Sequence, residues 1–213
     1  MIRTYFNGKA AIWDEIAAEK DQSKLKQMAE RLDISPGSRV LDIGTGTGVF
    51  IPYILHSIGC EGKVLALDIA EEMLHRARAK SFNGAVAYLN ADVAHIPLLE
   101  ASVDSVVCYS SFPHFQDKEK ALSEICRVVK RGGHLFICHS SSRGAINGIH
   151  NGIPEVAHDV IPEEWEMREM LSEAGFADIV IEDNCENYLC RALKKGQLER
   201  IRVKLEADIQ RLR

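Results

Sequence analysis

The stretch VLDIGTGTG, from Val40 to Gly48, decides the fold of this chain. It begins as a short apolar run interrupted by one carboxylate, Asp42, and continues with glycines at every second position. Glycine lets the backbone turn sharply and approach a ligand closely. The stretch therefore predicts a buried strand that ends in a ligand-binding turn, just before a helix.

Asp42 narrows the choice of ligand for this turn. A glycine-rich turn alone is weak evidence, because dinucleotide-binding folds carry a related one. A P-loop is excluded, since no Lys-Ser/Thr pair follows the glycines. A carboxylate two residues before the first glycine would repel a pyrophosphate, but it suits an ammonium or sulfonium group. S-adenosylmethionine carries both of these cations and no phosphate, so Asp42 favours it.

Strand-like and helical segments alternate on both sides of the glycine turn. The expected strands are 39–43, 63–68, 86–90, 103–110 and 133–140, with helices at 49–58, 71–80 and 118–129. This alternation predicts an α/β fold with a mostly parallel sheet and helices on both faces. After a further helix at 163–174, residues 177–193 indicate a hairpin that turns around Asn184–Asn187.

Two more carboxylates follow the next two expected strands. Asp68 ends the second strand, at the position from which an acid binds ribose hydroxyls. Asp92 follows the third strand, where it could meet an adenine amino group. Each acid alone would be a helix N-cap or a solvated loop residue. Three acids at the carboxyl ends of successive strands instead predict a nucleoside site, because such edges line the ligand crevice of open α/β sheets.

At this point a family resemblance is visible. VLDIGTGTG, VLALDIAEEML (64–74), the stretch 90–115 and ALSEICRVVKRGGHLFI (121–137) follow one another in order. This run resembles class I S-adenosylmethionine-dependent methyltransferases, especially the small-molecule branch (methyltransferase type 11) that includes quinone-biosynthesis enzymes. The resemblance implies a Rossmann-like seven-stranded sheet with an antiparallel last strand. It also implies methyl transfer from S-adenosylmethionine to a small molecule by in-line displacement.

The resemblance also assigns residues. In the family, the glycine turn and its preceding acid hold the methionine end, the second-strand acid holds the ribose, and the fourth strand ends near the methyl group. The cofactor residues implied here are Asp42, Gly44, Thr45, Gly46, Gly48, Asp68, Ile69, Met73, Asp92, Val93, Tyr109 and Ser110. An N-terminal helix often closes over the cofactor in this family, and Tyr5, Phe6 and Trp13 are the aromatic candidates for such a lid.

The segment 138–159 carries a cluster of polar residues beside the expected methyl donor. His139 closes the fifth strand, and Arg143, Asn147 and His150 would form one stripe on a short helix capped by Ser142. One interpretation is a substrate-recognition cap, in which Arg143 pairs with an anionic acceptor and His139 or His150 acts as a base. His114, after the fourth strand, is a further candidate base.

Two other interpretations of the cluster stay open. His139, His150, His158 and Asp159 could bind a divalent metal, because imidazole and carboxylate groups suit zinc, iron, nickel or manganese. Their spacing matches no compact metal motif. Alternatively, the histidines hydrogen-bond the loop itself and have no contact with an acceptor.

The expected organisation is one methyltransferase domain over 1–193, with cap or lid helices in 1–35 and an acceptor-side insertion at 139–162. Residues 194–213 form an amphipathic helix, which either packs on its own domain or joins two chains as a homodimer. The net charge of −5 argues against a nucleic-acid surface. No apolar run has membrane-spanning length, and no signal peptide precedes the domain, so a cytoplasmic protein without a membrane partner is expected.

The function predicted from the sequence is therefore S-adenosylmethionine-dependent methyl transfer to a small-molecule acceptor. One alternative is a metal-assisted methyltransferase, or one acting on a metal-containing acceptor, that uses the histidine cluster. An alternative of another class is a non-catalytic regulatory dimer that binds S-adenosylmethionine.

Overall fold

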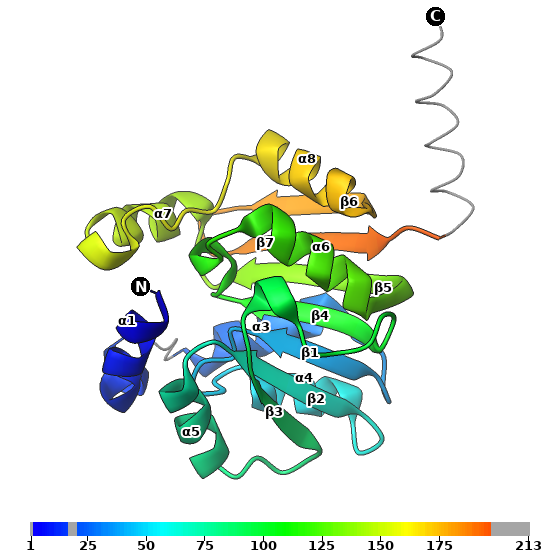
Figure 1. The fold of residues 1–213 in the computed structure, drawn as a ribbon, viewed down its shortest axis with the longest axis horizontal. Helices are drawn as coiled ribbons and strands as arrows, with labels where there is room; N and C mark the ends of the chain where they lie inside the picture. The colour runs from blue at the N-terminus through cyan, green and yellow to red at the C-terminus, as the bar shows by residue number, and fades with distance from the viewer. Residues whose placement is uncertain (1, 17–20, 197–213) are drawn as a thin grey trace, which may run out of the picture.

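Seven strands form one sheet in the computed structural model, which describes residues 2–16 and 21–196 (Figure 1). Their order across the sheet is β3-β2-β1-β4-β5-β7-β6. The strands are β1 (Arg39–Ile43), β2 (Lys63–Asp68), β3 (Val86–Asn90), β4 (Val103–Tyr109), β5 (Val129–His139), β6 (Phe176–Asp183) and β7 (Tyr188–Lys194). The strands from β1 to β5 pair in parallel, while β7 lies antiparallel to both of its neighbours. The predicted sheet, with its antiparallel last strand, is confirmed.

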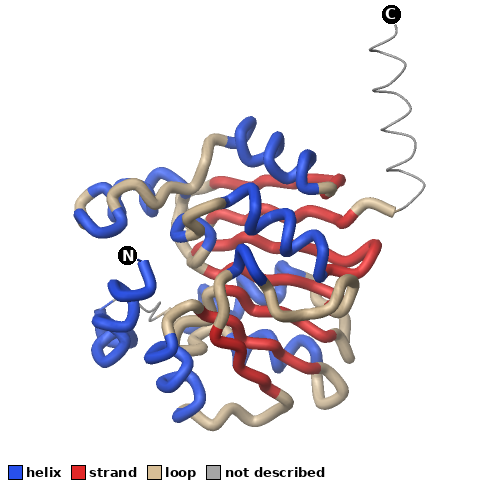
Figure 2. Tube along the Cα trace, in the orientation of Figure 1, coloured by secondary structure: helices blue, strands red, loops and turns tan. Residues whose placement is uncertain are grey.

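Helices cover both faces of this sheet, as Figure 2 shows. They are α1 (Ile2–Lys9), η1 (Ala10–Ile12), α2 (Trp13–Ile16), α3 (Gln22–Leu32), α4 (Ile51–Ile58), α5 (Glu71–Ala79), η2 (Val93–His95), η3 (Phe112–His114), α6 (Lys118–Val128), α7 (Arg143–Asn151), η4 (Pro154–Val156) and α8 (Glu164–Ala174). One core cluster joins α6 and α8 to one face of β1, β4 and β5, and a second joins α3 and α4 to the other face. Burial on both faces explains why these strands read as continuous apolar runs.

The sheet changes direction between β1 and β4, since β2 and β3 lie on one side of β1 and the later strands on the other. In open α/β sheets a ligand crevice forms at this switch point, outside the carboxyl ends of the strands. The short elements α1, η1 and α2 lie at this end, beside α5, and α7 lies there as well (Figure 1). We call residues 2–16 the lid.

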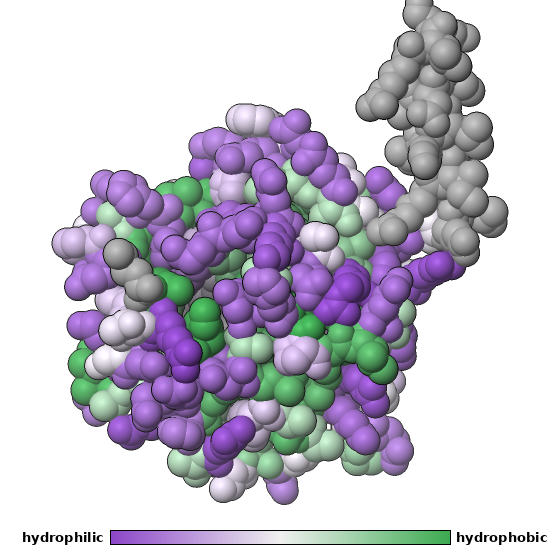
Figure 3. Space-filling view, viewed as in Figure 1, coloured by the Kyte–Doolittle hydropathy of each residue, from purple (hydrophilic) through white to green (hydrophobic). Residues whose placement is uncertain are grey.

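The insertion between β5 and α8 contains the predicted short helix. Ser142 caps α7 by accepting a hydrogen bond from the Ala145 N–H, and Gly152 follows the helix as its C-cap. Figure 3 shows a mostly hydrophilic face with hydrophobic patches around the lid and α7. No helix within 2–16 and 21–196 is long and apolar enough to cross a membrane. Lys194 ends β7, so the predicted amphipathic helix does not begin there, and residues 197–213 of that prediction lie outside the described residues.

Candidate functional site

The glycine turn lies at the carboxyl end of β1 in a left-handed conformation. Gly44 and Gly46 have φ angles of 68° and 55°, which side-chain-bearing residues rarely adopt. A Cβ atom on Gly44 would lie 2.4 Å from the Cβ of Ser111, so no larger residue fits there. The Ser111 hydroxyl in turn donates a hydrogen bond to the Ile43 carbonyl, which ties the end of β4 to the turn. The turn is therefore shaped by close backbone packing.

Two carboxylates are buried behind this turn. Asp42 and Asp68 are 2% and 7% exposed. Asp42 accepts a hydrogen bond from the Thr45 hydroxyl at 2.5 Å, and Asp68 accepts from the N–H groups of Gly46 and Ala70, both at 2.8 Å. Within the described ranges, no Lys or Arg forms an ion pair with either acid. The pair thus forms a buried negative site.

Their titration reflects this burial. The pKa of Asp42 is raised to about 7, chiefly by burial and in smaller part by the neighbouring Asp68 carboxylate, against the Thr45 hydrogen bond. Burial likewise raises the pKa of Asp68 to about 6, against the N–H groups of Ala70 and Gly46. The charge of His114 favours the ionised form of Asp68 only in part, and neither carboxyl group forms an ion pair with a Lys or Arg of the described residues. A ligand with positive charge would favour their ionised forms.

The other predicted cofactor residues lie around the same edge. Asp92 caps η2 by accepting a hydrogen bond from the Ala94 N–H at 2.8 Å, so one of its carboxylate oxygens stabilises the start of this helix. Tyr109 stacks on Phe50 with ring centroids 4.5 Å apart. Ser110 has a φ angle of 52°, an unusual conformation for serine at the carboxyl end of β4. Three more of the predicted cofactor residues lie at this edge, through apolar side chains or a backbone carbonyl: Ile69, Met73 and Val93.

The lid packs directly on the glycine turn. A Cβ atom on Gly46 would lie 3.9 Å from the Trp13 indole nitrogen, and Trp13 packs with Phe6 against a small cluster that contains Met73. Asp14 accepts a hydrogen bond from the Thr47 hydroxyl and pairs with Lys80 at 2.8 Å. The N-terminal segment therefore covers the cofactor end of the crevice.

The lid also reaches the opposite side of the crevice. Phe6 contacts the edge of the His114 ring, with ring centroids 5.0 Å apart. His114 Nδ1 lies 2.8 Å from Asp159 Oδ2, and both side chains are mostly buried, at 15% and 13% exposure. The ring of His150 also packs against His114, with ring centroids 4.8 Å apart. The His114 imidazole is thus held by a carboxylate and contacts two other rings.

The polar stripe of α7 binds the returning loop rather than the crevice. Arg143 pairs with Glu163 at 2.7 Å and lies 3.7 Å from a carboxylate oxygen of Asp183. Asn147 and the backbone of Ile161 exchange two hydrogen bonds, of 3.0 and 2.8 Å. His150 Nδ1 donates to the Asp159 carbonyl. These contacts fix the loop 159–163 and thereby place Asp159 beside His114.

His139 is the most deeply buried histidine of this region, at 1% exposure. Its pKa is lowered to about 3, chiefly by burial and in smaller part by the nearby imidazoles of His114 and His150. Neither ring nitrogen has a hydrogen-bond partner among the described residues, and the same holds for the hydroxyl of Tyr188. The two residues pair across β5 and β7, with ring centroids 6.3 Å apart.

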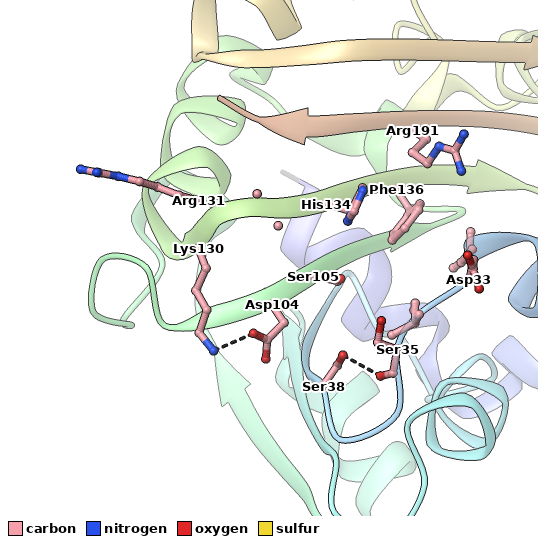
Figure 4. A pocket seen from close by; sticks show the side chains of 14 residues that line it. Asp33, Ser35, Ser38, Asp104, Ser105, Lys130, Arg131, His134, Phe136 and Arg191 are labelled. Carbon is pink, nitrogen blue, oxygen red and sulfur yellow. Dashed lines mark hydrogen bonds and ion pairs between the residues drawn. The ribbon is translucent and has the colours of Figure 1, made fainter. Parts of the chain in front are cut away.

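A separate cavity of about 340 Å³ lies at the opposite edge of the sheet (Figure 4). Its lining includes Asp33, Ser38, Asp104, Lys130, His134 and Arg191. Lys130 pairs with Asp104 at 2.6 Å, and the Ser38 hydroxyl donates to the Ser35 carbonyl. This cavity lies at the amino-terminal side of β4, away from the carboxyl ends where such sheets bind ligands. The crevice, with its buried acids, remains the candidate site.

Comparisons with known proteins agree with this geometry. The methyltransferase domain family matches residues 41–137. The methyltransferase GfsG of Streptomyces halstedii is 29% identical over 140 residues, covering 65% of this chain and 50% of its own length. The ubiquinone/menaquinone biosynthesis C-methyltransferase UbiE of Haemophilus ducreyi is 28% identical over 173 residues, which cover 68% of this chain and 67% of that protein. The crystal structure of a SAM-dependent methyltransferase from Aquifex aeolicus is 25% identical, with a TM-score of 0.70 over 88% of this chain and 98% of that one.

Residues 41–137 are similar to a methyltransferase domain, and the fold is that of S-adenosylmethionine-dependent methyltransferases. This similarity confirms the resemblance seen in the sequence. The chain spans about half the length of several of the curated relatives that it matches. The cofactor of this methyltransferase family fits the residues present. Buried Asp42 and Asp68 form no ion pair with a Lys or Arg in the part of the chain that the structure describes, and the cofactor carries two cations. The missing Cβ atoms of the glycine turn leave its backbone open to the ligand.

Two of the sequence hypotheses for the candidate site are not supported by the contacts. Arg143 was assigned to an anionic acceptor, but its guanidinium is paired with Glu163 and Asp183. The residues His139, His150, His158 and Asp159 were assigned to a metal, but no group of three or more potential ligands capable of holding an ion occurs in the described ranges. His150 Nδ1 and the carboxylate of Asp159 are already hydrogen-bonded, to the Asp159 carbonyl and to His114 respectively, so they do not converge on one point.

Three features of the candidate site were not predicted from the sequence. Asp14 links the lid to Thr47 and Lys80, although it stands in an ordinary amphipathic segment. Asp159 was considered only as a metal ligand, although it is the partner of His114, 45 residues away. Tyr188 was read only as part of a hairpin. Its place opposite His139 follows from strand register, which the spacing of the two segments does not reveal.

Asn147 offers a direct test of how the loop is held. Replacing it by alanine removes both hydrogen bonds to Ile161, so we expect a loss of about 1–3 kcal/mol in the free energy of unfolding. The Ile161 amide should also exchange its hydrogen at least roughly tenfold faster, as local opening becomes easier. Gly148→Ala is the matched control on the same helix, because a Cβ atom there meets nothing within 4 Å. Equal hydrogen-exchange rates of the Ile161 amide in Asn147→Ala and Gly148→Ala would contradict the role of Asn147 in holding the loop.

Proposed function

We propose that this chain transfers a methyl group from S-adenosylmethionine to a small-molecule acceptor, with His114 as the general base. The supporting observation is the contact between His114 and Asp159, mostly buried beneath the lid and within electrostatic reach of Asp68. The cofactor supplies an electrophilic methyl group when bound. Every further requirement falls on the protein: alignment of the acceptor, exclusion of water and removal of a proton.

The proton path follows from the hydrogen bond that His114 makes. With Nδ1 donating to the Asp159 carboxylate, Nε2 carries the lone pair and can accept a proton from the acceptor. The carboxylate holds the required tautomer and stabilises the imidazolium that forms. Phe6 and His150 both pack against the His114 ring and limit its rotation. His139 suits this task less, because a group with a pKa of about 3 is a weak base near neutral pH.

The charges around the crevice favour an uncharged acceptor over the anionic one considered at first. Arg143 is engaged by two acids, and the Lys118 ammonium donates to the carbonyls of Pro113 and Phe115. Neither cation is available to an anion. A metal-assisted reaction finds no support in the donor geometry, and a purely regulatory role gives no reason for the His114–Asp159 pair. The homodimer through 194–213 and the cytoplasmic location stay predictions.

The first experiment measures cofactor binding and turnover together. Isothermal titration with S-adenosylmethionine should show stoichiometric binding, and Asp68→Ala should weaken it by about 100-fold, because a charged acceptor of the ribose hydroxyls is lost. Glu169→Ala, an exposed acid on α8, is the control and should bind as the unmodified chain does. Release of S-adenosylhomocysteine should then depend on an added phenol, alcohol or amine. Equal affinity in Asp68→Ala and the unmodified chain would contradict the assigned site.

A further inference from the structure

Three polar atoms at the carboxyl end of β5 have no partner in the described structure: both ring nitrogens of His139 and the hydroxyl of Tyr188. Both residues are 1% exposed. An unsatisfied buried polar group costs about 1–3 kcal/mol, and native proteins hold few of them. Three such atoms on two facing residues therefore indicate that a group outside the described residues completes their hydrogen bonds.

Their position is on the acceptor side of the crevice. His139 is the last residue of β5 and pairs in register with Tyr188, the first residue of β7. The adjacent Cys138 carbonyl accepts a hydrogen bond from the N–H of Ser110, where β4 ends near the cofactor site. His139 is also within electrostatic reach of His114 and His150. The unsatisfied pair thus lies next to the proposed base, deeper in the fold.

The environment of this pair disfavours charge of either sign. Burial lowers the pKa of His139, so the imidazolium is disfavoured, and burial raises the pKa of Tyr188, so the phenolate is disfavoured as well. A ligand ammonium or carboxylate placed there would meet the same desolvation cost. The neutral imidazole offers one donor and one acceptor, and the phenol hydroxyl can do both. The group that matches them is uncharged and both donates and accepts, as a hydroxyl does.

We propose that His139 and Tyr188 form a subsite that anchors a neutral hydroxyl group of the methyl acceptor. This inference rests on the proposed function, because the subsite serves the same crevice. The anchored hydroxyl hydrogen-bonds to His139 and Tyr188 and orients the rest of the acceptor toward His114. The subsite is a recognition element, and no proton transfer to His139 is required.

The binding test does not depend on turnover. In protein with ¹⁵N-labelled histidine and S-adenosylhomocysteine bound, dihydroxybenzenes should shift the His139 ring signals, which His139→Leu identifies by their loss. Phenol, with one hydroxyl, should shift them less, and benzoate and benzylamine should leave them unchanged. Larger shifts with the charged probes, or none with the three dihydroxybenzene isomers, would overturn the subsite. Failure of S-adenosylhomocysteine to bind at all would instead count against the proposed function.

The matched variant is Tyr188→Phe, which removes only the hydroxyl. We expect KM for the preferred dihydroxybenzene to rise about 3- to 10-fold, the worth of one hydrogen bond, with the affinity for S-adenosylhomocysteine unchanged. The urea midpoint of the ligand-free protein should stay the same or rise, because an unsatisfied group is removed. A lower midpoint with an unchanged KM would show a purely structural hydroxyl, satisfied by buried water, and would overturn the proposal.

Discussion

Replacing His114 by glutamine should lower kcat by about 10²- to 10⁴-fold, the usual contribution of a positioned general base. Glutamine keeps a polar side chain of similar length, but it has no basic nitrogen. The affinity for S-adenosylmethionine should hardly change, since His114 makes no hydrogen bond to the glycine turn, Asp42 or Asp68. The measurement is initial-rate kinetics on an acceptor that the unmodified chain methylates, together with titration calorimetry of the cofactor.

Asp159→Asn provides the second arm of this experiment. An amide in place of the carboxylate removes the charge that stabilises the imidazolium and no longer fixes the tautomer of His114. The two substitutions should be strongly non-additive, with the double variant close to the slower single one, because both residues act as one unit. Additive losses, or a kcat reduced less than threefold in His114→Gln, would contradict the role of this pair.

Affinity for S-adenosylmethionine should fall by roughly 100-fold between pH 7.5 and pH 5.5. Asp42 and Asp68 have pKa values of about 7 and about 6, so acidification protonates the carboxylates that receive the cationic cofactor. Both values lie above those of an unfolded chain, so the native state binds protons more tightly than the unfolded state does. The stability of the ligand-free protein therefore declines as pH rises through this window, while cofactor binding strengthens.

Thermal melts over the same pH range separate the two effects. The gain in melting temperature on adding S-adenosylmethionine should increase from pH 5.5 to pH 7.5, as mass action on a tighter complex requires. In Asp42→Asn the pH dependence of binding should be clearly shallower, because one of the two titrating groups is gone. A gain in melting temperature that is constant from pH 5.5 to pH 7.5, or an unchanged pH dependence of binding in Asp42→Asn, would rule out this electrostatic account.

Much of the fold could be predicted from local sequence. The strands β1, β2 and β3 begin and end where the apolar runs do. In β1 and β2 burial on both faces leaves few polar positions, whereas β3 lies at the edge of the sheet and has no fully buried residue. The helix α7 was also predicted from its Ser142 cap and Gly152 stop, despite two internal glycines. The cofactor edge could be predicted because its residues are spaced by the regular alternation of strand and helix.

The acceptor side was harder to predict, for a physical reason. Arg143, Asn147 and His150 do share one face of a helix, but sequence spacing cannot tell which surface that face meets. Here it meets the loop 159–163, whose backbone offers the carbonyl and N–H groups that the stripe binds. The contacts of His114 with Asp159 and of His139 with Tyr188 span 45 and 49 positions and depend on how whole elements pack.

The lid couples two events, the enclosure of the cofactor and the packing of Phe6 against His114. Phe6 packs against Trp13, so the residue beside His114 and the residue over Gly46 belong to one small body. Any motion that lets a spent cofactor leave must also pull Phe6 away from the imidazole. The proposed base would then be fully supported only while the donor is enclosed. We therefore expect ordered kinetics, in which the donor binds first and the demethylated donor leaves last.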